Sequence, residues 1–235
     1  MVENMARPLI IVCAGGHASE LASAIREVQI AGGPIDVRCF VDDHRFESTF
    51  EGAPLLGGVD ELGTYLRLHA DEQFWYIAAV GDNRTRAAVV RRIESLSADN
   101  LTAWTARHVT AIVGDTVQIG VGSRLGPGAI VTARVTMGDH CIINANSSVS
   151  HDVEIASYVN VCPGAAICSG VTIGQGCYIG AGATIADGVQ VGAWSVISAG
   201  AVVSDDIPAH VTVDGVPARI VQRHGRAMRQ TTLAG

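Results

Sequence analysis

The chain has 235 residues, including 27 glycines and 23 acidic residues, and all 16 of its basic residues are arginine. The lack of lysine excludes a P-loop and Schiff-base or pyridoxal chemistry, because each of these requires a lysine amine. A formal net charge of −7 argues against a protein that binds nucleic-acid backbones, since such proteins need a basic surface.

The composition also indicates the class and location of the protein. With 48% apolar and only 17% charged residues, the chain is expected to form a buried core. No apolar run is as long as a transmembrane helix, and the first residues lack the pattern of a signal peptide, so we expect a cytoplasmic protein. The six cysteines include no CxxC pair, and in a reducing compartment they are expected to be free thiols.

Three apolar runs in the first part of the chain predict parallel β-strands, at Pro8–Cys13, Val37–Val41 and Phe74–Val80. A helix is predicted after the first strand, and we expect it to end near Gly32-Gly33. Its apolar face comprises Leu21, Ala24, Ile25 and Val28. A second, arginine-rich helix follows the third strand. This order of strands and helices predicts a small doubly wound sheet.

The carboxyl ends of these strands meet at one edge of the sheet, where such folds bind ligands. The residues that follow the strands there are Gly15, Gly16, His17, Asp42, Asp43 and Gly81. The glycine turn and the helix N-terminus after it favour an anion, and the two aspartates can accept hydrogen bonds from a base or ribose. The alternative for the aspartates is a solvated turn. A dinucleotide fingerprint does not fit, because Cys13 and Ala18 stand at two of its glycine positions.

A six-residue repeat occupies the second half of the chain. Every sixth residue from Val113 to Val203 is aliphatic or methionine, which makes sixteen positions without a break, and the residue four places later is small or β-branched. The pattern predicts a triangular β-solenoid with 18 residues per coil and about five coils, stacked at about 4.8 Å. We expect the aliphatic residue to fill the interior, the small residue to lie at the corner, and the frequent glycine after the aliphatic to supply backbone freedom.

The repeat contains two histidines, His140 and His151, and their hexad positions allow both to point outward. Asp152 follows His151 directly, and a carboxylate near an imidazole raises its basicity. Because adjacent strand residues point to opposite faces, Asp152 reaches His151 only if a corner lies between them. Cys162 has no base near it in the sequence, so we interpret it as a small packed residue rather than a nucleophile.

Six motifs together carry a resemblance to a known family. They are Ala14-Gly15-Gly16-His17, Phe40–Asp43, Gly81–Arg86, the segment from Asn144 to His151-Asp152, Pro163-Gly164-Ala165 and Gly215–Arg219. The repeat resembles the left-handed β-helix of the hexapeptide-repeat acyltransferases. The whole chain resembles the sialic acid O-acetyltransferase and nucleotide-aminosugar N-acetyltransferase family, which includes the bacillosamine and perosamine N-acetyltransferases.

The resemblance implies roles for individual residues. His151 corresponds to the general base, Asp152 to its supporting carboxylate and Asn144 to a polar residue of the same site. The nucleotide pocket would comprise Gly15, Gly16, His17, Asp42, Asp43 and Gly81. The acetyl-CoA groove would comprise Asn160, Ser169, Ala181 and Arg219. The chain departs from the family at two positions, with Asp152 where the family often has Glu and Asn160 where it often has His. No metal is expected, because the γ-carbonic anhydrases on this fold need three zinc-binding histidines, two of them five residues apart.

We therefore predict three segments: a Rossmann-like nucleotide-sugar-binding domain in residues 1–106, a left-handed β-helix acetyltransferase domain in 107–210, and a tail in 211–235. The basic residues of the tail are Arg219, Arg223, His224, Arg226 and Arg229. They would contact the phosphates of CoA or lie on a solvated C-terminal helix.

The predicted function is acetyl transfer from acetyl-CoA to the amine of a nucleotide-linked 4-amino sugar, by a homotrimer that binds no nucleic acid and has no membrane span. Two alternatives stay open. One is O-acetylation of a sialic-acid-type sugar, and the other is a non-catalytic trimeric scaffold that binds a nucleotide sugar.

Overall fold

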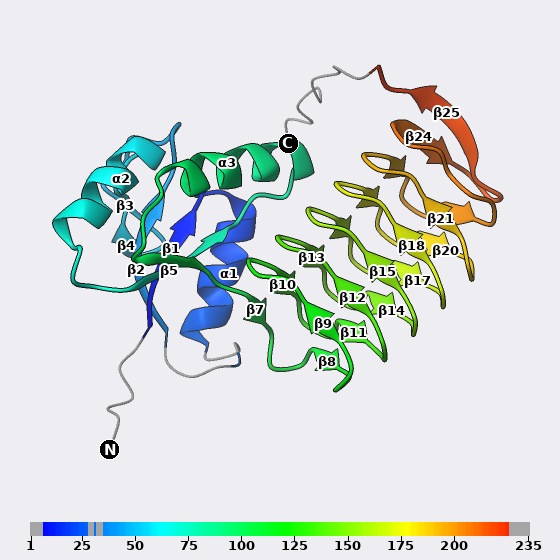
Figure 1. Ribbon diagram of the computed structural model, residues 1–235, viewed down its shortest axis with the longest axis horizontal. Helices are drawn as coiled ribbons and strands as arrows, with labels where there is room; N and C mark the ends of the chain where they lie inside the picture. The colour runs from blue at the N-terminus through cyan, green and yellow to red at the C-terminus, as the bar shows by residue number, and fades with distance from the viewer. Residues whose placement is uncertain (1–6, 28–30, 32–34, 226–235) are drawn as a thin grey trace.

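The structure is a computed structural model that describes residues 7–27, 31 and 35–225. An α/β domain lies at one end of a long β-helix, and the chain runs from the first into the second (Figure 1). The predicted fold class, an α/β domain followed by a left-handed parallel β-helix, is confirmed. None of the helices in the described ranges is long and apolar enough to cross a membrane.

The α/β domain contains a four-stranded parallel sheet in the order β2-β1-β5-β6. Its strands are β1 (Arg7–Val12), β2 (Ile35–Val41), β5 (Phe74–Ala78) and β6 (Leu101–Ala103), and its helices are α1 (Gly16–Arg26), α2 (Val59–Leu68) and α3 (Asn83–Ser95). A short hairpin joins β3 (Thr49–Phe50) to β4 (Ala53–Pro54). Side chains of β1 alternate between two cores, with Leu9 and Ile11 packed in the core of α1, and Ile10 and Val12 in the core of α2 and α3.

The predicted strands are confirmed, but two details of the helices differ. Helix α1 ends at Arg26, before the predicted end at Gly32-Gly33, while Val28, Gly32 and Gly33 lie outside the described residues. Helix α2 was not predicted. Its signal is the spacing of Val59, Leu62 and Leu66, all buried, after an N-terminus at which the Glu61 carboxylate accepts a hydrogen bond from the Gly58 N–H at 2.8 Å.

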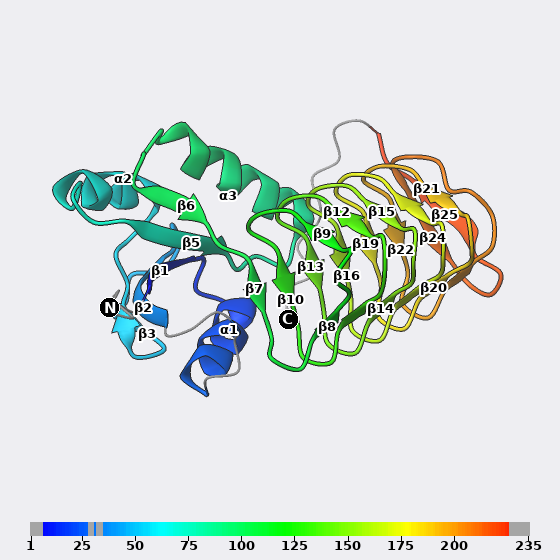
Figure 2. The same ribbon diagram turned by 60° about the horizontal axis from the view of Figure 1, so that its bottom comes forward.

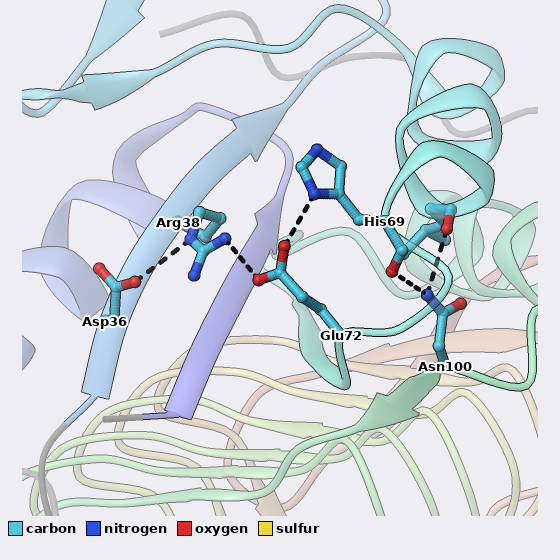
Figure 3. Close-up of polar contacts among 6 residues, drawn as sticks. Asp36, Arg38, His69, Glu72 and Asn100 are labelled. Atoms are coloured by element: carbon cyan, nitrogen blue, oxygen red, sulfur yellow. Dashed lines mark hydrogen bonds and ion pairs between the residues drawn. The ribbon is translucent and has the colours of Figure 1, made fainter. Parts of the chain in front are cut away.

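Polar contacts hold the C-terminal end of α2 against the sheet (Figure 3). The Asn100 amide nitrogen donates to the carbonyl oxygens of Leu66, in the last turn of α2, and of His69, its C-cap residue, at 3.2 and 3.1 Å. Glu72 contacts His69 Nδ1 at 2.8 Å and accepts from Arg38 of β2 at 2.9 Å. The pKa of Glu72 is lowered by these hydrogen bonds, first that from Arg38 and then that from His69. Polar side-chain contacts therefore join the sheet to α2, in addition to the apolar packing of the core.

The β-helix has three faces, each a stack of short parallel strands. The first face comprises β7 (Ala106–Arg107), β10 (Arg124–Leu125), β13 (Ile142–Ile143), β16 (Asn160–Val161), β19 (Tyr178–Ile179), β22 (Val196–Ile197) and β24 (Val211–Asp214). The second comprises β8 (Ile112–Val113), β11 (Ile130–Val131), β14 (Ser148–Val149), β17 (Ala166–Ile167), β20 (Thr184–Ile185) and β23 (Val202–Val203). The third comprises β9 (Gln118–Ile119), β12 (Thr136–Met137), β15 (Glu154–Ile155), β18 (Thr172–Ile173) and β21 (Gln190–Val191).

The register between coils follows the 18-residue period, so Leu125 pairs with Ile143 and Val131 with Val149. The hexad aliphatics fill the interior, as predicted, and Ile143, Val161 and Ile179 are fully buried. We call the corner between the first and second faces the first corner, that between the second and third faces the second corner, and that between the third and first faces the third corner.

Glycine after the hexad aliphatic has a different role from the predicted one. The left-handed conformation occurs two residues later, at the fourth hexad position, where Arg134, His140 and Asp152 have φ of 51°, 54° and 59°. At the glycine itself, the constraint is space. A Cβ on Gly174 would lie 2.5 Å from the Ala193 nitrogen of the next coil. These glycines therefore allow the coils to stack.

The C-terminal segment extends the β-helix. Strand β24, at Val211–Asp214, pairs with β22 as a further rung of the first face. Strand β25 (Arg219–Arg223) returns antiparallel to β24. The alternative of a solvated helix for the tail is therefore wrong within the described residues, because Arg219 and Arg223 lie on this strand. Arg226 and Arg229 lie outside the described residues.

The two domains meet along the first face and the third corner, where α1 and α3 lie beside the first coils (Figure 2). Arg86 of α3 is 1% exposed, and its Nε donates to the His140 carbonyl at 2.9 Å and its Nη2 to the Tyr158 carbonyl at 3.0 Å. On the other side, Nη1 donates to the carbonyls of Val80 at 2.7 Å and Gly81 at 3.2 Å. Burial lowers the pKa of Arg86 to about 10, which still leaves it charged at neutral pH.

His140 points outward from the solenoid, as predicted, but it is not exposed to solvent. It lies outside the solenoid, but the α/β domain covers it, so that it is 3% exposed and stacked between the rings of Tyr76 and Tyr158 at 6.2 and 5.5 Å. Burial lowers its pKa to about 4. The same corner carries Trp194, whose ring lies 4.6 Å from the Arg84 guanidinium. The third corner is thus part of the domain interface.

The glycine finding predicts a difference between two alanine substitutions. Gly174→Ala should lower the free energy of unfolding by about 3 kcal/mol, because the added Cβ forces neighbouring coils apart. Gly188→Ala should lower it by only about 1 kcal/mol, because Gly188 has a φ of +72° but no atom within 4 Å of the added Cβ. Urea unfolding measures both values, and equal losses would contradict the stacking argument.

The domain interface predicts a second outcome. Arg86→Leu should lower the free energy of unfolding by about 2–4 kcal/mol, because it leaves buried carbonyls of both domains without donors. Arg67→Leu is the control, since Arg67 is exposed on α2 and donates to Thr64 on the same helix. Calorimetry of both variants compares the losses, and an Arg86 variant as stable as the Arg67 variant would contradict the anchoring role.

Candidate active site

The predicted nucleotide-binding residues gather at the carboxyl edge of the α/β sheet. Asp42 joins two strand ends, because its Oδ2 accepts from the Ala14 N–H at 2.8 Å and its Oδ1 accepts from the His44 N–H at 2.8 Å. Asp43 forms an ion pair with Arg92 and accepts from the Val59 N–H at 3.2 Å. Both aspartates therefore already bind groups of the protein, which the sequence did not indicate.

The start of α1 lies open beside this edge. Gly15 and Gly16 are exposed, and a Cβ added to either would meet nothing within 4 Å. No side chain in the described part of the chain caps the helix at Gly15, so its first N–H groups are available to an anion.

His17 and Gly81 close the edge on the side of the β-helix. A Cβ on Gly81 would lie 2.7 Å from His17 Nε2, so the close approach requires glycine. Arg124 of β10 donates to the His17 carbonyl at 3.3 Å and forms an ion pair with Glu20 at 2.9 Å. Burial, and next the charge of Arg124, lower the pKa of His17, which favours the neutral imidazole.

Asn144 lies at the first corner and connects with this edge through Asn160. The Asn144 amide nitrogen donates to Asn160 Oδ1 at 2.9 Å, and the Asn160 amide nitrogen donates to the Gly81 carbonyl at 3.1 Å. Asn160 is only 3% exposed. It is enclosed between Asn144 and the α/β domain, so in the single chain it presents little surface to a cofactor.

His151 and Asp152 lie at the second corner. His151 Nδ1 is 2.7 Å from Asp152 Oδ2, a contact that the left-handed φ of Asp152 makes possible between adjacent residues. Arg134, one coil earlier, binds both carboxylate oxygens at 2.6 and 2.8 Å. The Arg134 hydrogen bonds first, and then that of His151, hold the pKa of Asp152 well below its usual range. Arg134 was not predicted as a site residue, although its spacing of 18 residues from Asp152, one full coil, is the signal that could have indicated it.

The other predicted cofactor residues are distributed over both corners and the C-terminal strand. Ser169 lies one coil beyond His151 on the second corner, and its N–H donates to the Asp187 carboxylate at 3.0 Å. Ala181 lies on the first corner, two coils beyond Ala145. Arg219 is exposed on β25 and lies 3.5 Å from Asp205. No cluster of potential metal ligands occurs among the residues that the structure describes.

Within one copy, the site residues form two separate groups. Asn144 and Ala181 lie on the first corner, and His151, Asp152 and Ser169 lie on the second. The two corners border the second face, and strand β14 lies between Asn144 and His151. Of these two corners, the first is connected with the α/β domain, because Asn144 donates to Asn160 and Asn160 donates to the Gly81 carbonyl.

Comparison with known proteins identifies the family. Residues 8–93 match the model described as the PglD N-terminal domain, and residues 170–205 match the bacterial transferase hexapeptide (six repeats). PerB from Caulobacter crescentus, crystallised with CoA and GDP-perosamine, is 30% identical over 91% of this chain and 96% of its own, with a TM-score of 0.80. The chain belongs to the nucleotide-aminosugar N-acetyltransferase family.

Two further structures agree with this membership. The acetyltransferase domain of PglB from Neisseria gonorrhoeae, in complex with acetyl coenzyme A, is 30% identical over 92% of this chain and 100% of its own, with a TM-score of 0.78. WeeI from Acinetobacter baumannii is 27% identical over the same shares, with a TM-score of 0.78. No curated protein sequence matches significantly. As a member of this family, the chain is an acetyl-CoA-dependent sugar N-acetyltransferase.

The contacts of Asp152 predict that its pKa changes when Arg134 is substituted. In Arg134→Gln the pKa of Asp152 should rise towards the ordinary aspartate value, because the charge and both hydrogen bonds of the guanidinium are lost. A carboxyl-detected NMR titration of the two proteins measures this. The same midpoint in both would show that Arg134 does not hold the carboxylate.

Proposed function

We propose that the enzyme acetylates the amine of a nucleotide-linked amino sugar, with His151 as general base, at a site formed between two copies of the chain. The observation that carries the proposal is the contact from Arg134 through Asp152 to His151. A carboxylate bound to Arg134 can only accept a hydrogen bond, so His151 Nδ1 carries the proton. In the neutral imidazole the other ring nitrogen, Nε2, then carries the lone pair and can act as a base, and the side chain is exposed.

The chemistry requires no covalent intermediate on the protein. The amine nitrogen forms a bond to the thioester carbonyl carbon while His151 Nε2 accepts a proton from the nitrogen. The C–S bond then breaks, and the departing CoA thiolate takes up the proton from the imidazolium. Asp152 stabilises the imidazolium in between, because it is negatively charged and 2.7 Å from Nδ1.

The arrangement of the corners supports a homotrimer. The outward side chains of the second face are uncharged: Ile112, Ile130, Ser148, Ala166, Thr184 and Val202. Ile112 and Ile130 are 62% and 38% exposed in the single chain, as expected for a surface that another copy covers. If three second faces surround a common axis, the first corner of one copy meets the second corner of the next.

This assembly would join the two groups of site residues. Asn144 and the nucleotide edge of one copy would face His151 and Asp152 of the neighbour. Ser169 and Ala181 would face each other across the groove between the two β-helices, where acetyl-CoA would bind, with Arg219 as a phosphate contact. Gly15, Gly16, His17, Asp42 and Gly81 would form the nucleotide pocket, whereas Asp43 would act through Arg92.

The relatives support this assignment. PerB was crystallised with both CoA and GDP-perosamine, a nucleotide-linked amino sugar. Two further crystal structures of that enzyme carry an asparagine or an alanine in place of one histidine, again with CoA and GDP-perosamine.

The role of His151 predicts the outcome of its substitution. His151→Asn should lower kcat by about 10²–10⁴-fold, because the general base is lost. The melting temperature should stay unchanged, because the side chain is 56% exposed. The assay follows CoA release with nucleotide-linked 4-amino sugars, and His210→Asn is the control at another corner. Wild-type turnover in His151→Asn would exclude the assignment.

The shared site predicts complementation between inactive variants. His151→Ala and Asn144→Ala chains, mixed and reassembled as trimers, should recover about one quarter of wild-type activity, because random mixing pairs an intact Asn144 with an intact neighbouring His151 at that frequency. The unmixed variants serve as controls. If both residues act from the same copy, no activity returns.

A further inference from the structure

The hydrogen bonds of Asn160 fix which way its amide group points. A carbonyl oxygen can only accept, so the nitrogen of the Asn160 amide, and not its oxygen, must face Gly81 O at 3.1 Å. Gly81 O is itself held in place by Arg86, whose Nη1 donates to it at 3.2 Å. Because Asn160 is only 3% exposed, a reversed amide would place two oxygens together without water to separate them.

The orientation of Asn160 sets that of Asn144. Asn160 Oδ1 faces Asn144 and can only accept, so Asn144 must present its amide nitrogen, which lies at 2.9 Å. The Cys162 thiol is directed at the same oxygen at 3.9 Å, and burial raises the pKa of Cys162, which keeps the thiol protonated and a donor. The second group of the Asn144 amide, Oδ1, is therefore the one left for a ligand, and it has no hydrogen-bond partner among the residues that the structure describes.

We propose that Asn160 is a positioning residue, which makes Asn144 a hydrogen-bond acceptor and so selects an amine over a hydroxyl as the acetyl acceptor. The inference rests on the proposed function. A neutral amine has one lone pair and two N–H groups. The lone pair attacks the thioester carbon, one N–H faces His151 Nε2, and the other donates to Asn144 Oδ1.

A hydroxyl nucleophile cannot satisfy both residues. Its single O–H must face His151 Nε2, and a lone pair of its oxygen would then meet Asn144 Oδ1. This leaves the acceptor of Asn144 unpaired, and such a mismatch lowers reactivity towards the wrong substrate by about 10²–10⁴-fold. The orientation of the Asn160 and Asn144 amide groups thus favours N-acetylation over O-acetylation.

Two substitutions of Asn160 test whether its hydrogen-bond donor and acceptor matter, rather than the asparagine side chain itself. A neutral histidine has one donor and one acceptor nitrogen, so Asn160→His can still donate to Gly81 O and accept from Asn144. Leucine has the size of asparagine but neither group, so Asn160→Leu leaves the Asn144 amide free to reverse. Asn160→Leu should lower kcat for the amino sugar by about 10–100-fold, whereas Asn160→His should retain kcat within about threefold.

The measurements distinguish positioning from cofactor binding. KM for acetyl-CoA should be unchanged in Asn160→Leu, whereas a residue of the CoA groove would raise it. The matched sugar with a hydroxyl in place of the amine is assayed as a substrate and as a competitive inhibitor. In Asn160→Leu its inhibition constant should fall relative to wild type, because a reversed Asn144 amide can donate to the hydroxyl oxygen.

A buried asparagine far from the site supplies the control for stability. Asn100 is 8% exposed and its amide nitrogen donates to two carbonyls, so Asn100→Leu should lower the melting temperature with kcat and the inhibition constant unchanged. An Asn160→Leu enzyme with wild-type kcat, or with a raised KM for acetyl-CoA as its sole defect, would overturn the inference. A wild-type enzyme that acetylates no amino sugar would instead refute the proposed function.

Discussion

The arrangement of the site depends on one buried cation. The Arg86 guanidinium lies between the two domains and forms no ion pair with a carboxylate in the described part of the chain, and backbone carbonyls of both domains accept its hydrogen bonds. A buried charge is stable only when such partners surround it, so the α/β domain is held in one position on the third corner. Through Gly81 O, the same guanidinium also fixes Asn160, and Asn160 fixes Asn144. Domain docking and the orientation of a proposed substrate contact are therefore one network.

The corners of the β-helix supply the second constraint. Each coil turns through a left-handed residue at the fourth hexad position, and at most coils glycine or a polar residue accepts that conformation. In the coil that contains His151, the left-handed residue at the second corner is Asp152, and the turn brings its carboxylate back towards the His151 imidazole. A solenoid strand alone could not do this, because its neighbouring side chains point apart. The periodic fold thus produces a paired imidazole and carboxylate at an exposed edge.

Much of this could be predicted from the sequence, for identifiable reasons. The six-residue period from Val113 to Val203 determines the β-helix, because each aliphatic must enter the same interior. The apolar runs predicted the strands, and the motifs after them predicted the edge where Asp42 and Gly81 lie. The enclosure of Asn160 and the anchoring by Arg86 could not be predicted, because both depend on backbone carbonyls, which every residue has. The contact between Asp152 and His151 requires a positive φ at Asp152. A glycine at that position would have indicated a positive φ, but an aspartate does not.

The most direct test of acetylation between two copies of the chain is a crystal structure with CoA and a nucleotide-linked 4-amino sugar. We expect the amine nitrogen to lie about 3 Å from His151 Nε2 of one copy and from Asn144 Oδ1 of its neighbour. An amine that lies away from His151, or that contacts both residues of the same copy, would contradict it.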